Sequence, residues 1–417
     1  MEIVRSRLLR SLLNGALAGR RRAWMSKPLR YSSPADHKTL AQSELLLRDH
    51  VGTWFQGSRH ERRFLRYAPE FVDEHAAPSG FPFIGPAVYT SPPVFVVAQN
   101  DARLLGYRTL VSGRTFHDDE ILLSAEATTA YLDKLDSADT FLNEQTGLRR
   151  LVPGSPEFSI TAGARVERHI PGTTVVLCSH EPGNYGSFLF RVLPKLRTLA
   201  ELGLTGAQVM AWAWPAPFRR LLEIFGIPEA RLIQHDLNSI TRFDRVLVPS
   251  LRNPNALLDR ESHALMQAVA DQHRGAVRGR RLYISRLRHG KVSGSTRVLQ
   301  NEEELVAALA KLDFAIIEPE SLTSEQQIAE FESADLIVGP AGSALFNVMF
   351  CRPGTKVIDL ESEPNWIYAH SGLFASCQTR YGLVIGRTDP TDERPVHRRW
   401  TVDVPALMDR ISSFIRA

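Results

Sequence analysis

The chain has 417 residues, 43% of them apolar and 23% charged, a composition that excludes an intrinsically disordered chain and a protein built of membrane-spanning helices. The first 30 residues carry a net charge of +7 against +4 for the whole chain, so the rest is mildly acidic and nucleic acid is not an expected partner. Three cysteines without CxxC spacing argue against a disulfide framework or a zinc site, and a reducing compartment fits best.

The N-terminal segment 1–24 places leucines at helical spacing with arginines between them. Its apolar run is too short and too interrupted to span a bilayer. Three interpretations remain open for the extension 1–30: a basic amphipathic helix on an anionic membrane surface, a solvated basic extension, and a targeting peptide, although no apolar region with a small-residue cleavage site is visible.

Residues 31–80 mix charges, histidines and prolines without sustained periodicity, and we interpret them as an irregular lead-in. Prolines interrupt the apolar runs of 80–100, which predicts short strands and turns. The run from His117 to Glu120 contains potential metal ligands, but it precedes an apolar stretch as an acidic helix start would. We therefore assign this run to helix capping.

Strand and helix patterns then alternate in two series. The first series has strands expected at 172–180, 208–214 and 245–250, with helices at 185–202 and 218–227. After a helical segment at 256–273, the second series has strands expected at 280–286, 314–319, 335–340 and 356–361, and helices at 301–313, 324–334 and 343–352. Asn301 and Glu304 are expected to form a cap pair at the start of the helix 301–313.

This alternation predicts parallel sheets, and hence an α/β fold with two Rossmann-like domains facing each other across a cleft. The expected boundaries are 31–265 for the first domain, including the lead-in, and 266–400 for the second. A last helix lies within 401–417. Because no strand follows it, we expect it to cross back and pack over both halves.

The stretch from Asp335 to Leu360 carries the strongest local signal for a ligand. Small residues from Pro340 to Ala344 leave the backbone uncovered where a strand ends and a helix begins. Unpaired amides and the helix dipole favour an anion such as a diphosphate at that position. The alternative is a tight turn in which small residues only permit close packing.

The loop after the strand at 280–286 favours the anion interpretation. It contains no acidic residue, and its cationic or imidazole side chains are Arg286, Arg288, His289, Lys291 and Arg297. Guanidinium and ammonium groups suit phosphate oxygens, although a solvated basic loop is the alternative. Because both features follow strands of one parallel sheet, they are expected at the same edge.

Several ordered motifs resemble glycosyltransferase family 61, whose bacterial members are often described as capsular polysaccharide biosynthesis proteins. The motifs are NYGSFLFRVLPKL, YISR, NEEEL, EQQIAEFESADLIVGPAGSALFN and FCRPGTKVIDLE, and the resemblance covers roughly Cys178 to Glu361. It implies a GT-B-like fold, a nucleotide-sugar donor held mainly by the second domain, inversion at the anomeric carbon, and neither an obligatory metal nor another cofactor.

The resemblance also implies roles for single residues. Arg286 would contact the donor diphosphate, the turn at Gly342 and Ser343 would supply amides to it, and Asn347 would brace the loop or touch the donor. Carboxylates at the end of the next strand would accept hydrogen bonds from ribose hydroxyls. The implied donor-binding residues are Arg286, Lys291, Arg297, Gly342, Ser343, Asn347 and Glu361, with Asp359 as a second carboxylate that is equally compatible with a surface position.

An inverting transfer needs a general base that deprotonates the acceptor hydroxyl. The loop at 179–186 follows a strand and so points into the expected cleft. It offers Glu181 as the base with His180 beside it, and Asn184 and Tyr185 on the acceptor side, where Ser187 follows directly after the loop. A satisfied loop histidine and a helix cap at Asn184 are the alternatives.

Two positions depart from the family pattern, because Ser187 and Ala341 stand where many relatives have histidine. Either the chain belongs to a subgroup that uses other residues, or it binds without turnover. Further along, Trp366, Tyr368 and His370 could stack on a base or a sugar, and burial against the sheet is equally compatible.

The sequence therefore predicts a metal-independent, inverting hexosyl- or pentosyltransferase of capsular or extracellular polysaccharide biosynthesis. Its expected substrates are a nucleotide-sugar donor and a glycan or lipid-linked glycan acceptor, and its expected location is the cytoplasm, at the membrane face. The alternative is a non-catalytic nucleotide-sugar-binding or scaffold protein of a polysaccharide assembly complex. A hydrolase with Ser343 as nucleophile is disfavoured, because AGSAL lacks the GxSxG elbow.

Overall fold

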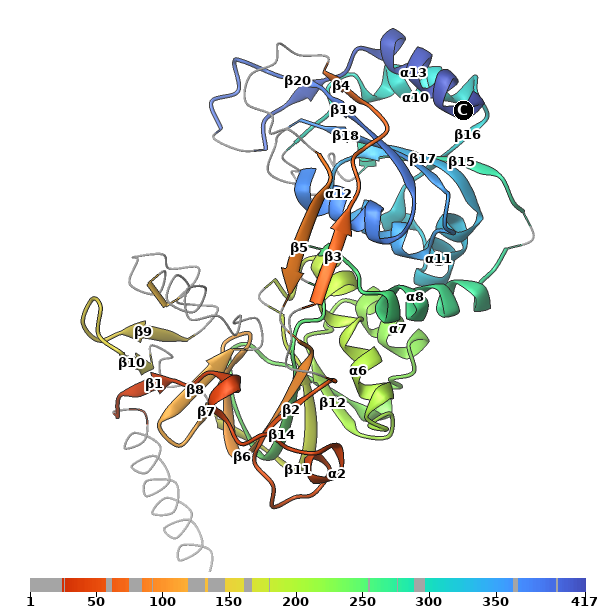
Figure 1. Cartoon of the computed structure of the whole chain (residues 1–417). Coiled ribbons are helices and arrows are strands. Elements are labelled where there is room, and N and C mark those ends of the chain that lie inside the picture. The colour runs from red at the N-terminus through yellow and green to blue at the C-terminus, as the bar shows by residue number, and fades with distance from the viewer. Residues whose placement is uncertain are drawn as a thin grey trace, which may run out of the picture.

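The computed structural model describes residues 25, 27–57, 62–74, 85–91, 93–118, 132–133, 147–160, 167–179, 181–253, 256–275, 277–288, 297–362, 367–394 and 397–417. These residues form two large sheets, placed one above the other in Figure 1, and two two-stranded ribbons. Within them, no helix is both long and apolar enough to cross a bilayer. The amphipathic helix predicted for 1–24 lies outside the described residues and stays a prediction.

The first sheet is mixed in strand direction. Its parallel part has the order β13 (Leu232–Gln234), β12 (Gln208–Ala211), β11 (Glu167–Leu177) and β14 (Ile240–Pro249). β14 then pairs antiparallel with β6 (Phe95–Leu105), which also pairs with β2 (Gly52–Phe55). The sheet continues through β7 (Thr109–Ser112), β8 (Thr115–Asp118), β1 (Leu29–Tyr31), β10 (Glu157–Ile160) and β9 (Leu148–Arg150).

The parallel arrangement predicted for this half is therefore correct only for β11 to β14. The strands β6, β7 and β8 form a meander because their short connections contain Gly106 and Gly113, both with positive φ, and such connections join antiparallel neighbours. His117, predicted to lie at a helix start, is instead buried in β8, with its ring 6.0 Å from that of His37.

The second sheet is parallel throughout. Its order is β16 (Phe314–Ile317), β15 (Arg280–Ile284), β17 (Ala334–Pro340), β18 (Lys356–Glu361), β19 (Arg380–Ile385) and β4 (Val72–Glu74). The strands predicted between 280 and 361 are confirmed. The chain order reverses between β15 and β17, and ligands of open α/β sheets bind at the carboxyl ends of strands at such a reversal.

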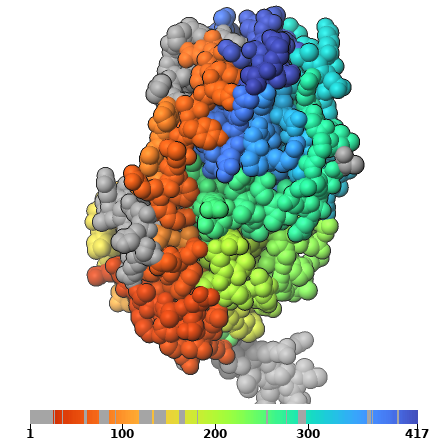
Figure 2. Space-filling model, turned by 45° about the vertical axis from the view of Figure 1, so that its right-hand side comes forward, coloured from red at the N-terminus to blue at the C-terminus, as the bar shows by residue number. Residues whose placement is uncertain are grey.

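The N-terminal part of the chain reaches both sheets. A ribbon of β3 (Arg62–Arg66) and β5 (Ala87–Ser91) connects the first sheet to β4, which pairs with the edge strand β19. Figure 2 shows this orange part of the chain along one flank, from the lower half to the upper half. The range 31–265, expected to form one domain, therefore contributes a strand to the second sheet. The expected boundary after 265 falls inside helix α8.

Helices and short turns connect these strands. The longer ones are α6 (Lys195–Glu201), α7 (Ala216–Ile224), α8 (Arg260–Gln272), α10 (Glu302–Ala310), α11 (Ser324–Ser333), α12 (Ile367–Ser376) and α13 (Val404–Arg416). The shorter elements are η1 (Pro34–Asp36), α2 (Gln42–Leu45), α5 (Tyr185–Ser187), the π-helix η2 (Phe188–Val192), η3 (Glu229–Arg231), η5 (Pro319–Ser321) and η6 (Ser343–Phe350), with a small ribbon of β20 (Arg387–Thr388) and β21 (Trp400–Thr401).

The last helix does not cross back over both halves, so that expectation is wrong. The buried side chains of α13, among them Leu407 and Phe414, belong to an apolar cluster formed with α10 and the second sheet. Lys356 on β18 also donates to the carbonyl of Phe414 at 2.8 Å. In Figure 1, α13 lies at the end of the molecule away from the first sheet.

The predicted cap pair at the start of α10 is also absent from the described contacts. Asn301 occupies the N-cap position, but its side chain bonds to the backbone of Val402, donating to the carbonyl at 2.8 Å and accepting from the amide at 3.2 Å. The side-chain amide thus ties the start of α10 to the segment before α13. Asn301 therefore bonds to a residue far away in sequence and not to the first turn of its own helix.

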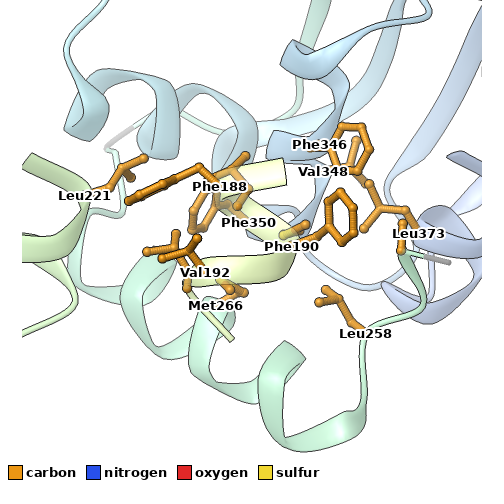
Figure 3. Close-up of a cluster of buried hydrophobic side chains, with 14 of the residues drawn as sticks. Phe188, Phe190, Val192, Leu221, Leu258, Met266, Phe346, Val348, Phe350 and Leu373 are labelled. Carbon is orange, nitrogen blue, oxygen red and sulfur yellow. The ribbon is translucent and has the colours of Figure 1, made fainter. Parts of the chain in front are cut away.

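The two sheets share one apolar core. A single cluster includes Val175 and Leu247 from the first sheet together with Ile337 and Val357 from the second. Figure 3 shows its centre, where side chains of η2 meet those of η6, α8 and α12. The rings of Phe190 and Phe346 stack there, with their centroids 5.3 Å apart. Because burial of such side chains drives folding, this contact fixes η2 against η6.

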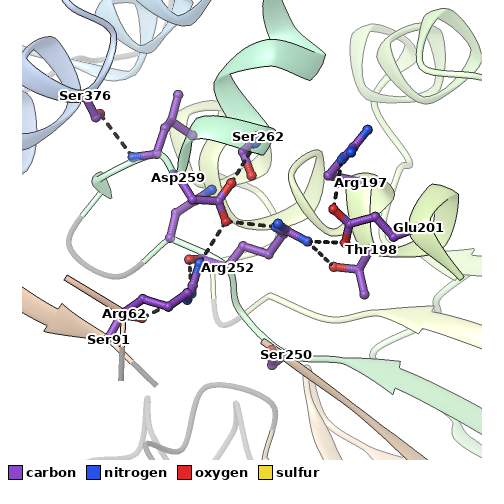
Figure 4. A network of polar contacts seen from close by, with 12 residues as sticks. Arg62, Ser91, Arg197, Thr198, Glu201, Ser250, Arg252, Asp259, Ser262 and Ser376 are labelled. Carbon is purple, nitrogen blue, oxygen red and sulfur yellow. Dashed lines mark hydrogen bonds and ion pairs between the residues drawn. The ribbon is translucent and has the colours of Figure 1, made fainter. Parts of the chain in front are cut away.

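A buried ion-pair network lies beside this core (Figure 4). The guanidinium of Arg252, 1% exposed, donates to Asp259 at 3.0 Å, to Glu201 at 3.0 Å and to Thr198 at 2.9 Å. Asp259 also accepts from Arg62 at 2.8 Å, and its other oxygen caps α8. The network therefore links α6, β3 and α8 through one aspartate.

Asp259→Asn should destabilise the fold. Asparagine keeps the helix cap but leaves the buried guanidinium of Arg252 undercompensated, and losing one partner of a buried pair costs about 3 kcal/mol or more. Urea denaturation measures the change. Asp271→Asn removes an exposed partner of Arg274 and should cost about 0.5 kcal/mol or less. Equal effects of the two substitutions would contradict the importance of the network.

The same network predicts a specific acid dependence. Burial alone would raise the pKa of Asp259, but Arg252 and the hydrogen bonds from Ser262 hold that pKa below its usual value. A carboxyl with a depressed folded-state pKa stabilises the fold above its unfolded pKa, and this contribution is lost as pH falls through the folded pKa. The Asp259→Asn protein should therefore lose less stability on acidification than the unsubstituted protein.

Candidate functional site

The loop after β11 is held by its own polar side chains. Asn184 caps α5, and its Oδ1 accepts from the amide of Ser187 at 3.1 Å and from the hydroxyl of Ser343 at 3.1 Å. Ser187 in turn donates to Oε2 of Glu181 at 2.5 Å. The loop is thereby fixed to the turn that follows β17, even though the two lie 159 residues apart in sequence.

That turn presents backbone amides at the start of η6. Gly342 is the N-cap residue, its carbonyl accepts from the amide of Leu345 at 3.1 Å, and no side chain caps the helix. Among the described residues, the amides of Gly342, Ser343 and Ala344 donate no hydrogen bond. Amides at a helix start carry partial positive charge, so this end of η6 suits an anion.

Arg286 lies beside the same turn, directly after β15. Its Nη1 is 3.3 Å from the carbonyl of Ala341, and Glu302 fixes the backbone by accepting from the amide of Arg286 at 2.7 Å. Burial, and then the neighbouring Arg297, lower the pKa of the Arg286 guanidinium to about 10, which leaves it charged at neutral pH. A half-buried cation thus faces the start of η6.

Two adjoining cavities open around these groups. The larger, about 540 Å³, is lined among others by Arg286, Tyr185 and Glu320. The smaller, about 290 Å³, is lined among others by Glu181 and Ser187. Asn184, Arg297, Gly342 and Ser343 line both cavities. The structure therefore brings these residues, predicted separately from distant segments, to one place at the reversal between β15 and β17.

Other predicted residues have different surroundings. Asn347 is fully buried and braces the loop, because its Oδ1 accepts from the Tyr185 hydroxyl at 2.9 Å and its Nδ2 donates to the carbonyl of Ala344 at 3.0 Å. Burial raises the pKa of Tyr185, so its hydroxyl stays protonated. His180 and Lys291 lie outside the described residues.

Glu361 does not line either cavity, in contrast to the predicted ribose contact. It is buried together with Asp359 and faces His370, whose Nδ1 is 2.8 Å from Asp359 Oδ2 and 3.5 Å from Glu361 Oε1. Both carboxylates therefore come from β18 and contact a side chain of α12. A donor contact through Glu361 would require this buried group to open.

These three side chains have ligand atoms within 4.8 Å of one another, close enough to consider a metal ion. The 2.8 Å contact between His370 and Asp359 is that of a hydrogen-bonded ion pair, which accounts for the grouping without a metal. The expected independence from metal stays a prediction.

Two contributors to the site were not predicted in this role. The Oε1 of Gln327 on α11 lies 3.1 Å from the Tyr185 hydroxyl oxygen, and its Nε2 donates to the carbonyl of Pro319 at 2.8 Å, so Gln327 joins the loop to the second sheet. His370 on α12 lines the smaller cavity, whereas the sequence suggested only stacking or burial. Trp366 lies outside the described residues. No spacing signal in the sequence pairs His370 with Asp359.

A comparison with protein-family models finds one match. The model described as Glycosyltransferase 61 matches residues 185–358. This region of the chain is a glycosyltransferase 61 region. No curated protein matches the chain. The glycosyltransferase 61 region runs from α5 to β18. It includes three of the four residues that line both cavities, Arg297, Gly342 and Ser343. The resemblance read from the sequence motifs is confirmed.

Gly186→Ala should disturb the candidate site through packing. A Cβ at position 186 would lie 2.8 Å from Cδ2 of Phe346, whose ring stacks on Phe190 and cannot move without losing that contact. We expect a loss of about 1–3 kcal/mol in the free energy of unfolding, measured in urea. Gly206→Ala is the control, since a Cβ there meets nothing within 4 Å. A Gly186→Ala protein as stable as the control would show that the contact tolerates a methyl group.

Proposed function

We propose that the chain is an inverting glycosyltransferase that transfers a sugar from a nucleotide-sugar donor to a glycan acceptor. The observation that carries the proposal is the meeting of Arg286 with the amides of Gly342 to Ala344 at the strand reversal of a parallel sheet, inside the glycosyltransferase 61 region. A guanidinium and helix-start amides are the groups that bind a diphosphate. A GT-B-like arrangement, with the donor on the second sheet and the acceptor loop on the first, belongs to this proposal.

In this proposal the nucleotide occupies the larger cavity and the sugar extends toward the smaller one. The diphosphate then lies at Gly342 and Ser343, which line both cavities, and Arg297 lies at the same junction. The smaller cavity also contains Glu181, on the loop of the first sheet. The anomeric carbon of the donor would therefore lie between the diphosphate site and a carboxylate.

Glu181 is the proposed general base. The hydroxyl of Ser187 donates to Oε2 of Glu181 and thereby fixes the direction of the carboxylate. The acceptor oxygen would form a bond to the anomeric carbon on the face opposite the diphosphate while its proton passes to Glu181 and the bond to the leaving oxygen breaks. This gives inversion with no covalent intermediate. Neither metal nor another cofactor has a part in this step.

The biological setting is also a proposal. We place the protein in capsular or extracellular polysaccharide biosynthesis, in the cytoplasm at the membrane face, with 1–24 as a peripheral contact to anionic lipid. The family resemblance and the basic composition of that segment support this setting. The donor sugar, the nucleotide base and the linkage are left open.

A second candidate function has a specific observation in its favour. Ser187 and Ala341 stand where many family members have histidine, which fits a protein that binds a nucleotide sugar without transferring it. Such a scaffold protein would gain thermal stability from a donor but release no nucleotide when an acceptor is added. Thermal shift against a panel of nucleotide sugars, followed by nucleotide-release assays with glycan acceptors, separates the two functions. No shift with any nucleotide sugar or nucleoside diphosphate would contradict both.

Arg286→Ala should weaken donor binding strongly while the protein stays folded. A charge-assisted hydrogen bond contributes about 1.5–3 kcal/mol, so the dissociation constant measured by calorimetry should rise by about tenfold or more. Arg288→Ala is a matched control in the same loop, because Arg288 is exposed and lies 3.7 Å from Glu318 outside both cavities. If Arg286→Ala and Arg288→Ala bind the donor equally well, the diphosphate site is misplaced.

Glu181→Gln should lower turnover by about 100-fold or more and change donor affinity little, because the amide cannot accept the acceptor proton. Steady-state kinetics and donor titration measure the two quantities. Glu223→Gln is the control, since Glu223 pairs with Arg220 on the surface of α7. Full activity of the Glu181→Gln protein would exclude this residue as the base.

A further inference from the structure

The buried group of Asp359, Glu361 and His370 is not used by the mechanism above. Its three side chains are at most 2% exposed, and two of them are carboxylates. Asp359 Oδ1 is buried without a hydrogen-bond partner in the described part of the chain. Burying carboxylates costs free energy unless a cation or protons compensate them, so the imidazole beside them must carry part of that compensation.

The geometry fixes which nitrogen of His370 does this. Nδ1 points at Asp359 Oδ2 at 2.8 Å, with Glu361 Oε1 at 3.5 Å on the same side of the ring. The ring is held between aromatic neighbours, with its centroid 5.4 Å from that of Phe346 and 5.8 Å from that of Phe374. The imidazole therefore has one orientation, with Nδ1 committed to the carboxylates.

His370 also lines one of the two cavities of the candidate site. His370 lines the smaller cavity together with Ser187, Gly342 and Ser343. Since Nδ1 is engaged with Asp359, Nε2 is the atom that remains for a ligand. The cavity therefore contains an imidazole although Ser187 and Ala341 do not supply one. Because η6 begins at Ser343 and packs Phe346 against this ring, the imidazole and the proposed diphosphate amides are set by one element.

We propose that His370 is a catalytic residue whose imidazolium donates a hydrogen bond from Nε2 to an oxygen of the leaving nucleoside diphosphate, with Asp359 as the positioning residue behind it. This inference rests on the proposed glycosyltransferase function, and it assigns a residue that stabilises the leaving group of that reaction.

The surroundings of His370 keep its imidazole protonated. Burial would lower the pKa of His370, but Asp359 and Glu361 on β18 outweigh it and raise that pKa well above the ordinary value. Burial, and then Asp359, raise the pKa of Glu361. The aromatic neighbours from η6 and α12 carry no charge, and the charged residues that line the smaller cavity with His370 are Arg191, Arg297 and Glu181. The raised pKa of His370 therefore favours an imidazolium beside Asp359 at neutral pH.

The step balances without another reactant. As the acceptor oxygen bonds to the anomeric carbon, the electron pair of the breaking bond passes to the diphosphate oxygen, and Glu181 takes the acceptor proton. His370 keeps its own proton and shares it with the diphosphate through the hydrogen bond. The negative charge that develops on the leaving group thus meets a cation already placed for it.

Affinity for paired nucleotides tests the assignment. Calorimetry would compare UDP with UMP, and GDP with GMP, on the full chain carrying His370→Gln. We expect diphosphate affinity to fall by about tenfold or more while monophosphate affinity changes little, because one charge-assisted hydrogen bond is lost. His117→Gln is the control, because it also removes a buried imidazole but lies in β8, away from both cavities.

A pH readout covers the case in which His370→Gln does not fold. In the double variant Asp359→Asn/Glu361→Gln the imidazole loses both carboxylates beside Nδ1, so burial should leave it neutral at neutral pH. Diphosphate affinity of the double variant should then rise as pH is lowered from about 8 to about 6, whereas the unsubstituted protein should show little change from this group. A flat profile for the double variant would overturn the assignment.

The remaining outcomes are distinguishable. If the unsubstituted protein binds no nucleoside diphosphate, with ADP, CDP and TDP tested beside UDP and GDP, the proposed function fails and this inference fails with it. If it binds a diphosphate and His370→Gln binds it equally well, only the role of His370 is overturned. Equal losses for diphosphate and monophosphate would show a structural role. If the unsubstituted protein holds one metal ion per chain and Asp359→Asn holds none, the group is a metal site, and the assignment of an imidazolium is overturned.

Discussion

The packing of η2 against η6 is the contact on which the candidate site depends. Phe190 stacks on Phe346, and Gly186 lets the two segments approach so closely that a Cβ at 186 would overlap the Phe346 ring. The loop that carries Glu181 leads through α5 into η2, and the amides of the proposed anion site begin η6. An apolar contact thus determines the distance between two polar groups that come from different sheets.

The π-helical geometry of η2 fits its position beside the candidate site. A π-helix turn is less regular than an α-helix and is found often at functional sites, where it redirects neighbouring side chains. Here it lies directly after α5, whose cap Asn184 also accepts from Ser343. The local irregularity and the long-range hydrogen bond act on the same loop. Together they hold the loop of the first sheet over the end of β17.

Periodicity predicted the second sheet well because its strands are short apolar runs separated by amphipathic helices. It could not predict that β4, from residues far upstream, adds to the edge at β19, since an edge pairing depends on chain geometry and not on local pattern. The same limit explains why the hydrogen bond of Asn301 was not predicted. The sequence offers a capping partner three residues away, whereas the folded chain brings Val402, far away in sequence, to the side chain. Antiparallel β6, β7 and β8 were missed because apolar alternation does not give strand direction.

The sequence predicted those loops of the site whose residue types are distinctive, namely the small residues around Gly342 and the basic segment that begins at Arg286. The buried pair of Asp359 and His370 was not predicted, because a carboxylate in a strand and a histidine in a helix 11 residues later carry no signature of contact. Electrostatic compensation in a core is a property of the folded arrangement.

A crystal structure with a bound nucleoside diphosphate is the most direct test of the anion site. The β-phosphate should lie against the amides of Gly342 to Ala344, within hydrogen-bonding distance of Arg286. A diphosphate bound elsewhere on the protein, with those amides and that guanidinium making no contact to it, would contradict the site and the transfer reaction built on it.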